Sequence, residues 1–253
     1  MGTSEFGVPT LEQIENNFNL LAIVTNYDKP SGRGLKIRNS AVKEYALKKN
    51  IKLIQPKNLK DQNFIKTIKE FNPDIIIVVA FRMLPKIIWC IPNIGTINLH
   101  ASLLPNYRGA APINWVLING EKYTGVTTFF IDDKIDTGDI LLQKRIKINE
   151  TDNAEDLHNS LSKTGSLLIY ETINGVVNKS IKPSKQESKK TYKTAYKLNK
   201  DNIKINWESK PIEIYNKIRG LSPYPGARTT IINNTNNTKK NIIIYDLSLI
   251  HIW

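Results

Sequence analysis

Residues 98 to 139 read NLHASLLPNYRGAAPINWVLINGEKYTGVTTFFIDDKIDTGD, and this stretch brings three polar side chains next to two predicted strands. The apolar run just before it predicts a strand whose end carries Asn98 and His100. Because alternate residues of a strand project to the same face, these two side chains can share one pocket. A second predicted strand, residues 125–131, leads into a loop that carries Asp136.

Each of the three side chains suits one part of a group transfer. The amide of Asn98 can donate a hydrogen bond to a developing oxyanion, and the imidazole of His100 can move protons near neutral pH. The carboxylate of Asp136, brought against His100, would orient the ring and favour its protonated form. Because no Ser or Cys nucleophile accompanies this set, we expect transfer to an incoming amine without a covalent enzyme intermediate.

Structural roles for the same residues stay open at this point. A lone histidine after a strand is more often a hydrogen-bonded structural residue. Asp136 in the sequence Asp-Thr-Gly also suits a turn, and Asn98 can satisfy a backbone group instead of a ligand. From the residues alone, the catalytic site is a hypothesis.

The runs HASLLPNYRGAAP (residues 100–112) and DTGD (residues 136–139) resemble the folate-dependent formyltransferases. Three further segments follow the order of that family: residues 2–9 (GTSEFGVP), 28–34 (DKPSGRG) and 218–226 (IRGLSPYPG). The resemblance covers nearly the whole chain, and it is closer to the members that formylate the amino group of methionine on initiator methionyl-tRNA. It implies that 10-formyltetrahydrofolate is the co-substrate and that this tRNA is the partner.

The resemblance also implies roles for individual residues. Asn98, His100 and Asp136 match the catalytic set of the family. The residues expected to border the folate are Ala80, Phe81, Ser102, Leu103, Leu104, Pro105, Asp132 and Asp133. The residues expected to contact tRNA are Arg33, Lys36, Arg38, Arg108 and Arg219.

Alternatives remain for some of these residues. Arg33 lies at the centre of a Gly-Arg-Gly loop that in the family enters the acceptor end of the tRNA, but by itself it reads as part of a solvated basic loop. Residues 102–105 either shape the folate pocket or form a plain turn. Arg108 either positions substrate or caps a helix.

Several positions depart from the pattern of the family. A small glycine-containing loop that borders the folate usually follows the strand at residues 74–80, whereas this chain has Phe81-Arg82 and is one residue shorter there. Lys134 stands where a glycine is usual. The family also has a strand before the motif that here starts at Met1. Either the true start lies upstream or this chain lacks that strand. Because the first strand of a doubly wound sheet is central, its absence would threaten folding and activity. The end of the chain, LSLIHIW, does not align with the family.

Helical and strand-like segments alternate along most of the chain. Residues 40–50 and 62–71 predict helices, residues 74–80 predict a buried strand, and residues 154–174 predict a long helix with leucines at helical spacing. This alternation predicts an α/β fold, with a Rossmann-like, mostly parallel sheet flanked by helices.

The chain divides into three predicted regions. Residues 1–180 form the catalytic domain. Residues 181–196 are charged and contain Pro and Ser, which indicates a linker. Residues 197–253 begin a smaller domain, where the family places an OB-like β-barrel that helps to hold tRNA and that is incomplete here.

The composition describes an ordinary globular protein with a basic C-terminal third. Hydrophobic residues make up 40% of the chain and charged residues 23%. From residue 178 onward, 15 Lys or Arg stand against 5 Asp or Glu, which contributes +10 of the net charge of +13. A basic region suits contact with a polyanion such as tRNA, although a compositionally biased genome also produces lysine-rich chains.

Other features of the sequence limit the cellular compartment and the kinds of ligand that we expect. A single cysteine, Cys90, cannot form an internal disulfide, and no segment resembles a signal peptide or a membrane span, so we expect a cytoplasmic protein without a membrane partner. No residues have metal-ligand spacing, so we expect no metal. We also expect a monomer. His158 and His251 lack matching partners and are expected to be structural or surface residues.

Three functions remain to be distinguished. The first is formylation of initiator methionyl-tRNA, which the Gly-Arg-Gly loop and the basic second domain favour. The second is formylation of an amino sugar or a purine precursor by the same core, which needs neither of these features. The third is RNA binding without catalysis, for which the Asn-His-Asp set would be superfluous.

Overall fold

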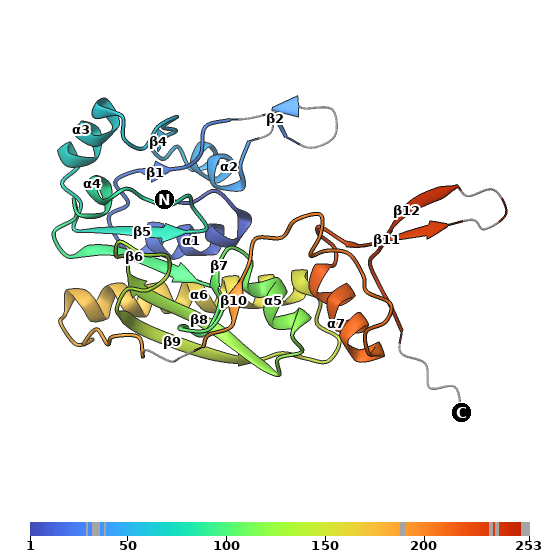
Figure 1. Ribbon diagram of the computed structural model, residues 1–253. Coiled ribbons are helices and arrows are strands. Elements are labelled where there is room, and N and C mark those ends of the chain that lie inside the picture. Colours follow the sequence, from blue (N-terminus) through green and yellow to red (C-terminus); the bar gives the residue numbers. More distant parts are fainter. Residues whose placement is uncertain are drawn as a thin grey trace.

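The computed structural model describes residues 1–28, 30–31, 36–37, 39–187, 191–232, 235 and 238–248 (Figure 1). In chain order the elements are η1 (Glu5–Gly7), α1 (Val8–Asn17), β1 (Ile23–Val24), β2 (Pro30–Ser31), β3 (Lys36–Ile37), α2 (Ala41–Lys48), β4 (Leu53–Ile54), α3 (Gln62–Glu70), β5 (Ile75–Val79), α4 (Lys86–Trp89), β6 (Gly95–His100), β7 (Arg108–Gly109), α5 (Pro112–Ile118), β8 (Tyr123–Phe130), β9 (Ile140–Lys147), α6 (Ala154–Val177), β10 (Thr194–Ala195), α7 (Pro211–Leu221), β11 (Ala227–Ile232) and β12 (Lys239–Ile244).

A four-stranded sheet in the order β5-β6-β8-β9 forms the centre of the first domain. β5 and β6 are parallel, whereas β6, β8 and β9 pair antiparallel. β8 and β9 are joined by a short loop, and a short connection allows only antiparallel neighbours. A separate parallel pair, β1 and β4, lies on the β5 side. The predicted α/β fold class is confirmed: β1 and β4, β5 and β6, and the short β7 and β10 pair in parallel.

Helices cover both faces of this sheet because β5 is apolar on both sides. Ile76 and Val78 pack into a cluster with residues of α3 and α4, including Phe64 and Ile88. The alternate residues Ile75, Ile77 and Val79 pack into a second cluster with α1 and α6. A strand buried on both faces has this continuous run of β-branched residues instead of an alternating one.

α6 is the largest helix against the sheet, and its start is fixed by a capping box. The side chain of Asn153 accepts hydrogen bonds from the amides of Glu155 and Asp156, and the carboxylate of Asp156 accepts one from the amide of Asn153. Gly165 allows the helix to approach β6, since a Cβ there would lie 2.7 Å from a methyl group of Leu99. This close approach holds β6, which carries two predicted catalytic residues, against the helix.

Within the described residues, only Met1 and Gly2 lie between β1 and β5. The amide of Gly2 donates to the carbonyl oxygen of Val24, and the carbonyl oxygen of Met1 accepts from the amide of Val79. Next to these two residues is a largely apolar cavity of about 500 Å³, lined in part by β1, β5 and α1. The central position of the sheet, where we expected the family's first strand, is therefore filled only at the end nearest the site.

The second region packs through α7 against α5 of the first domain. Asn114 Nδ2 donates to the carbonyl oxygen of Gly220, and a small apolar cluster centred on Ile218 and Leu221 also touches Ile118. β11 and β12 form an antiparallel hairpin that projects from this cluster (Figure 1). β11 also pairs at Arg228 with residues 203–205, and the described part of this region forms no closed barrel. None of the described helices is both long and apolar enough to cross a membrane.

We expect Leu161→Ala to destabilise the protein far more than Leu167→Ala. Both leucines lie on α6, but Leu161 is fully buried in the core whereas Leu167 is 50% exposed. Removing the buried side chain leaves a cavity and should lower the free energy of unfolding by about 2–5 kcal/mol, against about 0.5 kcal/mol or less for the exposed one. Urea denaturation of the two variants measures the difference, and equal midpoints would contradict the packing of α6.

Candidate active site

A cavity of about 710 Å³ opens where β5 and β6 end. Ala80 and Phe81 follow β5, and Asn98 and His100 come from the end of β6. The loop between β8 and β9 contributes Asp136. Ligands bind beyond the carboxyl ends of parallel strands, in pockets of about 300–1,000 Å³. The three predicted catalytic residues therefore line one cavity of the size of a ligand site.

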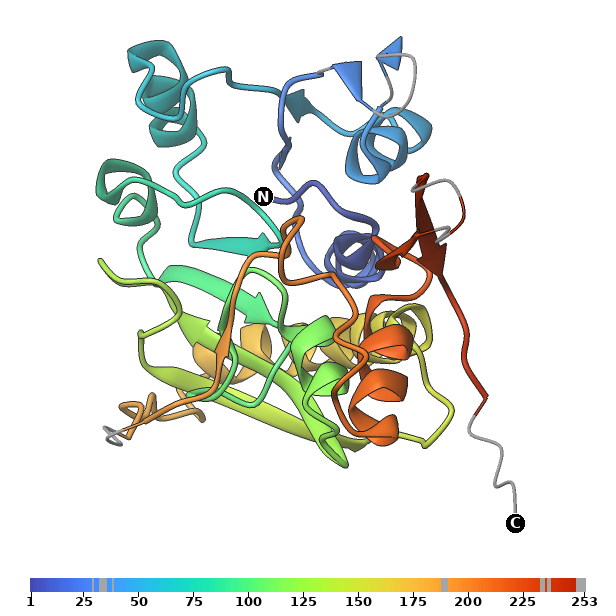
Figure 2. The same cartoon turned by 45° about the vertical axis from the view of Figure 1, so that its right-hand side comes forward.

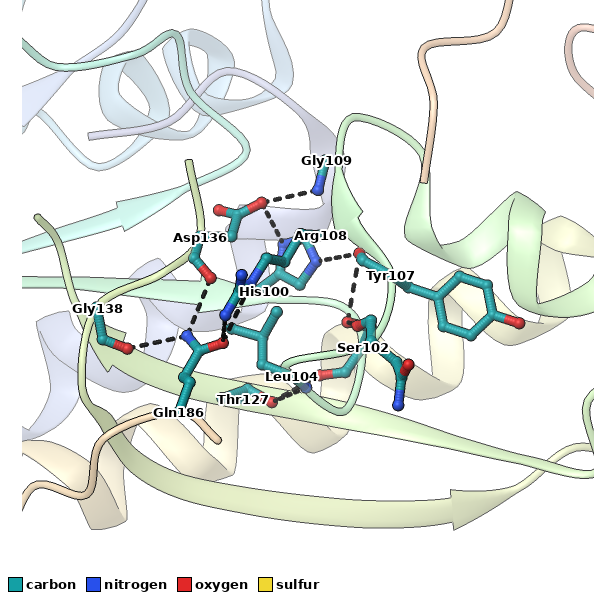
Figure 3. Close-up of polar contacts among 11 residues, drawn as sticks. His100, Ser102, Leu104, Tyr107, Arg108, Gly109, Thr127, Asp136, Gly138 and Gln186 are labelled. Carbon is teal, nitrogen blue, oxygen red and sulfur yellow. Dashed lines mark hydrogen bonds and ion pairs between the residues drawn. The ribbon is translucent and has the colours of Figure 1, made fainter. Parts of the chain in front are cut away.

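His100 is buried, with 7% of its surface exposed, and oxygen atoms face both ring nitrogens. Nε2 lies 2.8 Å from the carbonyl oxygen of Tyr107, which can only accept, so Nε2 carries a proton. Nδ1 lies 3.7 Å from Oδ2 of Asp136 (Figure 3). In the neutral ring the lone pair of Nδ1 therefore faces a carboxylate, which stabilises a proton accepted there.

The carbonyl of Tyr107 is held by a polar cluster behind His100. Ser102 Oγ donates to the carbonyl oxygen of Asn106, 2.7 Å away, and so fixes the turn. The hydroxyl of Tyr107 donates to Glu121 Oε1 at 2.5 Å, and Lys193 Nζ lies 2.5 Å from the same oxygen. Burial, followed by the bond to Glu121, raises the pKa of Tyr107 far above its usual range. Burial also tends to raise the pKa of Glu121, but the hydrogen bonds from Lys193 and Tyr107 outweigh it and lower this pKa below its usual range.

Asp136 occupies a tight loop and has a left-handed backbone, with φ of 55°. Its Oδ2 accepts a hydrogen bond of 2.9 Å from the amide of Gly109. Asp132 ties the loop together by accepting from the hydroxyl of Thr137 at 2.7 Å. Only glycine fits at position 138, because a Cβ there would lie 1.7 Å from a carbonyl oxygen of β8. The loop is therefore built to present the Asp136 carboxylate in one direction.

Asn98 lies in the wall of the cavity on the same strand as His100. Its backbone is fixed on both sides, by Val78 of β5 and Phe129 of β8. Its side-chain amide makes no hydrogen bond to the described residues, so both of its N–H donors are available to a ligand. An amide donor with a fixed backbone and no protein partner is what an oxyanion site needs.

The cavity contains only part of the predicted folate-binding set. Ala80, Phe81 and Asp132 line it. Asp133 points away, is exposed and lies 3.5 Å from Lys86 Nζ.

Residues 102–105 lie outside the cavity wall, and their predicted contact with folate stays a prediction. None of Ser102, Leu103, Leu104 and Pro105 lines the cavity. After His100 the chain turns behind the imidazole, where Leu104 is held by Thr127 Oγ1 and by Gln143 Nε2. These residues support His100 from behind.

The predicted RNA contacts divide into two groups. Arg33 and Arg38 lie outside the described residues, as does the side chain of Lys36 on β3. Arg108 neither caps a helix nor lines the cavity: its guanidinium donates to Gln186 Oε1 through Nε at 3.1 Å and Nη2 at 2.5 Å.

Arg219 uses its Nε and Nη1 donors inside the protein. Nη1 donates to the carbonyl oxygens of Asn149, Glu150 and Asp152 at 3.1–3.2 Å, and Nε donates to Asn216 Oδ1 at 2.9 Å. Burial lowers the pKa of this guanidinium. Arg219 therefore ties α7 to the turn before α6, and its predicted contact with tRNA stays a prediction.

The departures from the family pattern also have structural consequences. In the short loop after β5, the guanidinium of Arg82 donates to the carbonyl oxygens of Pro56 and Lys57, which fixes the loop while Phe81 lines the cavity. Lys134 also lines the cavity, and its amide donates to Asp132 Oδ1 at 3.0 Å.

Two residues near the site were not singled out as functional by sequence. His158 on α6, expected to be structural or at the surface, lines the cavity with its ring edge-on to Phe6, and no motif marks it. His251 lies outside the described residues. Gln186, in the predicted linker, binds the Asp136 loop, and a polar residue in a polar segment gives no signal of this.

Solved structures share this architecture. A sugar 3N-formyltransferase crystallised in the presence of dTDP and 5-N-formyl-tetrahydrofolate is 25% identical, with a TM-score of 0.66 over 92% of this chain and 85% of that one. A 4-N formyltransferase from Francisella tularensis, at 20% identity, has a TM-score of 0.70 over 95% of this chain and 93% of that one. The second likeness concerns the fold alone.

Sequence relatives are more similar. A methionyl-tRNA formyltransferase of Flavobacterium johnsoniae is 53% identical over 99% of this chain and 79% of its own length. One from Bacteroides thetaiotaomicron is 47% identical over 92% of this chain and 74% of its own length. The family model described as formyl transferase matches residues 2–173, and that of the formyl transferase C-terminal domain matches residues 197–251. The expectation that the end of the chain does not align with the family is therefore wrong as far as residue 251. This chain therefore belongs to the formyl transferase family.

Proposed function

We propose that this protein transfers the formyl group of 10-formyltetrahydrofolate to the amino group of methionine on initiator methionyl-tRNA, in the cytoplasm. The observation that carries the proposal is the meeting of Asn98, His100 and Asp136 around one cavity. The high identity to relatives that bear this name supports the choice of acceptor.

The geometry suits each of the three residues to one step of the proposed formyl transfer. The methionine amine attacks the formyl carbon, and the carbonyl oxygen becomes an oxyanion that Asn98 stabilises through its free amide donors. Nδ1 of His100 accepts the proton of the attacking amine, and the nearby Asp136 carboxylate stabilises the resulting imidazolium. When the bond between the formyl carbon and N10 of the folate breaks, His100 returns this proton to N10. A new amide forms and His100 regains its starting state.

The cavity has the mixed walls that a folate requires. Phe6, Leu84 and Phe129 provide apolar surface for a flat ring system, whereas the carboxylate of Asp132 and the side chains of the catalytic set provide polar contacts. Ala80, Phe81 and Asp132 are the residues that we propose border the folate. Asp133 faces away from the cavity but belongs to the same loop.

The tRNA would be held outside this cavity. The C-terminal third carries most of the net positive charge, and neutralising phosphates releases counterions and favours binding. Arg33, Lys36 and Arg38 remain proposed contacts on the loop after β1, whereas Arg108 and Arg219 are engaged within the protein.

An amino-sugar formyltransferase is the second candidate, favoured by the structural likeness to a sugar 3N-formyltransferase. Formyl transfer to initiator methionyl-tRNA and to a dTDP-linked amino sugar, measured side by side with 10-formyltetrahydrofolate, decides between the two. We expect product with the tRNA and none with the sugar. Turnover of the sugar alone would overturn the proposed acceptor.

We expect Asn98→Ala to lower kcat about 10²–10³-fold, which corresponds to about 2.7–4 kcal/mol of lost oxyanion stabilisation. The initial rate of formylmethionyl-tRNA formation at saturating substrates measures the loss. Asn174→Ala is the matched control, because this asparagine lies exposed on α6, bonded to the carbonyl of its own helix. Wild-type kcat in Asn98→Ala would exclude the oxyanion role.

We expect Arg219→Ala and Arg228→Ala to differ, although each removes one positive charge. Arg219→Ala leaves three carbonyl groups without their donor and should lower the free energy of unfolding by about 1.5–3 kcal/mol. Arg228 is exposed on β11, so its loss should change stability by about 0.5 kcal/mol or less. Urea denaturation measures both, and a wild-type midpoint for Arg219→Ala would contradict its structural role.

We expect tRNA binding to weaken steeply with salt, by about 10³–10⁵-fold between about 50 and 200 mM for six to ten phosphate contacts. Filter binding of initiator tRNA across this range gives the slope. A flat response would remove the basic C-terminal third from the proposed tRNA contact.

A further inference from the structure

We call residues 181–187 and 191–196 the connector, because they join α6 to the second region. The connector runs beside the segment that follows His100 (Figure 2). β10 pairs in parallel with β7, and the carbonyl oxygen of Ala195 accepts from the amide of Ala110 at 2.8 Å. Upstream, residues 182–185 and 187 are exposed, whereas Gln186 is half-buried. This glutamine is therefore the residue of that run that turns toward the active site.

The side-chain amide of Gln186 joins two loops of the site (Figure 3). Nε2 donates to the carbonyl oxygens of Asp136 and Gly138, each at 2.9 Å. Oε1 accepts both hydrogen bonds from the guanidinium of Arg108. The amide uses its two N–H groups and both lone pairs, and the opposite orientation would aim N–H groups at the donors of Arg108. The contacts therefore fix one orientation.

These contacts bear directly on the Asp136 carboxylate. The Gly109 amide holds its Oδ2, while Gln186 holds the carbonyl of the same residue. The left-handed backbone of Asp136 is unfavourable for a residue with a Cβ and persists only where its surroundings fix it. Without Gln186, two carbonyl groups of this loop lose their donor, and the strained residue is free to relax.

We propose that Gln186 is a positioning residue: it holds the Asp136 loop so that the carboxylate faces Nδ1 of His100. The kinetic part of this inference rests on the proposed function. The connector thereby contributes to catalysis, although it reaches neither the formyl group nor the amine. A displacement of about 1 Å at a catalytic group costs up to about 10²-fold in rate, so loss of this tie should be visible in kcat.

The substitution Gln186→Glu separates positioning from general attachment. A glutamate keeps an oxygen for Arg108 and so keeps the connector in place. It replaces the N–H donors with a second oxygen, which repels the carbonyl groups of Asp136 and Gly138. If this variant fails to fold, Gln186→Met has a similar length and removes both sets of contacts without adding charge.

Amide hydrogen exchange by NMR tests the tie without reference to activity. The Gly109 amide reports on the Asp136 carboxylate, and the neighbouring Ala110 amide reports on the connector through Ala195. In Gln186→Glu we expect exchange at Gly109 to rise about tenfold or more while exchange at Ala110 stays at the wild-type rate. Unchanged exchange at Gly109, or an equal rise at both amides, would overturn the proposal.

Kinetics supply the second readout. We expect Gln186→Glu to lower kcat for methionyl-tRNA formylation about 10–100-fold, with the KM for 10-formyltetrahydrofolate within about twofold of wild type. Lys185→Ala, at the adjacent exposed position, is the matched control and should keep the wild-type kcat. A kcat loss that only follows the folded fraction, measured by circular dichroism, would overturn a positioning role.

The two proposals fail in different ways. If the wild-type protein does not formylate methionyl-tRNA, the proposed function fails, and the exchange rates still decide whether Gln186 holds Asp136. If the wild type is active but Gln186→Glu retains full kcat, the positioning role fails and the proposed function stands.

Discussion

The backbone of residues 107–109 holds both His100 and Asp136. The Tyr107 carbonyl accepts from His100, and the Gly109 amide donates to Asp136, so two side chains far apart in sequence meet on one short segment. Gly109 has φ of 120°, and a Cβ there would lie 2.4 Å from the carbonyl oxygen of Ala195. The pairing with β10 and the geometry of the site therefore depend on the same glycine.

Anchoring by backbone groups has an electrostatic advantage. A buried carboxylate usually needs a counter-charge, and a fixed cation near Asp136 would compete with the imidazolium that forms in the proposed mechanism. An amide N–H satisfies the carboxylate without bringing a full charge. The nearest guanidinium, that of Arg108, is bound to the neutral amide of Gln186 instead. The carboxylate thus stays available to a proton on His100.

Local pattern predicted the elements that position the site, because those elements are stabilised by their own residues. The β-branched run of β5, the strand end at His100 and the leucine spacing of α6 each gave the correct element. The motif resemblance supplied Asp136, whose partner lies 36 positions away in sequence and cannot be found by periodicity.

What the sequence did not predict is the surroundings of individual side chains, most of them in loops. Ser102 and Leu104 follow His100 directly, yet the turn sends them behind the ring, a choice made by contacts with β8 and β9. The carbonyl groups that bind Arg219 were not predicted, because a positive charge in sequence does not reveal what surrounds it. Gln186 could not be chosen among polar neighbours, since its partners come from two distant loops.

The two distances from the His100 ring also indicate different roles for Tyr107 and Asp136. The 2.8 Å contact with Tyr107 is a hydrogen bond, whereas the 3.7 Å separation from Asp136 is too long for one. The carbonyl therefore sets the ring orientation and tautomer, a role that the sequence had assigned to the carboxylate. What remains for Asp136 is Coulombic attraction to the positive charge that the proposed mechanism places on the ring. That attraction exists only while the ring is protonated, so it favours the intermediate over the resting state, and its size depends on how firmly the loop holds the carboxylate.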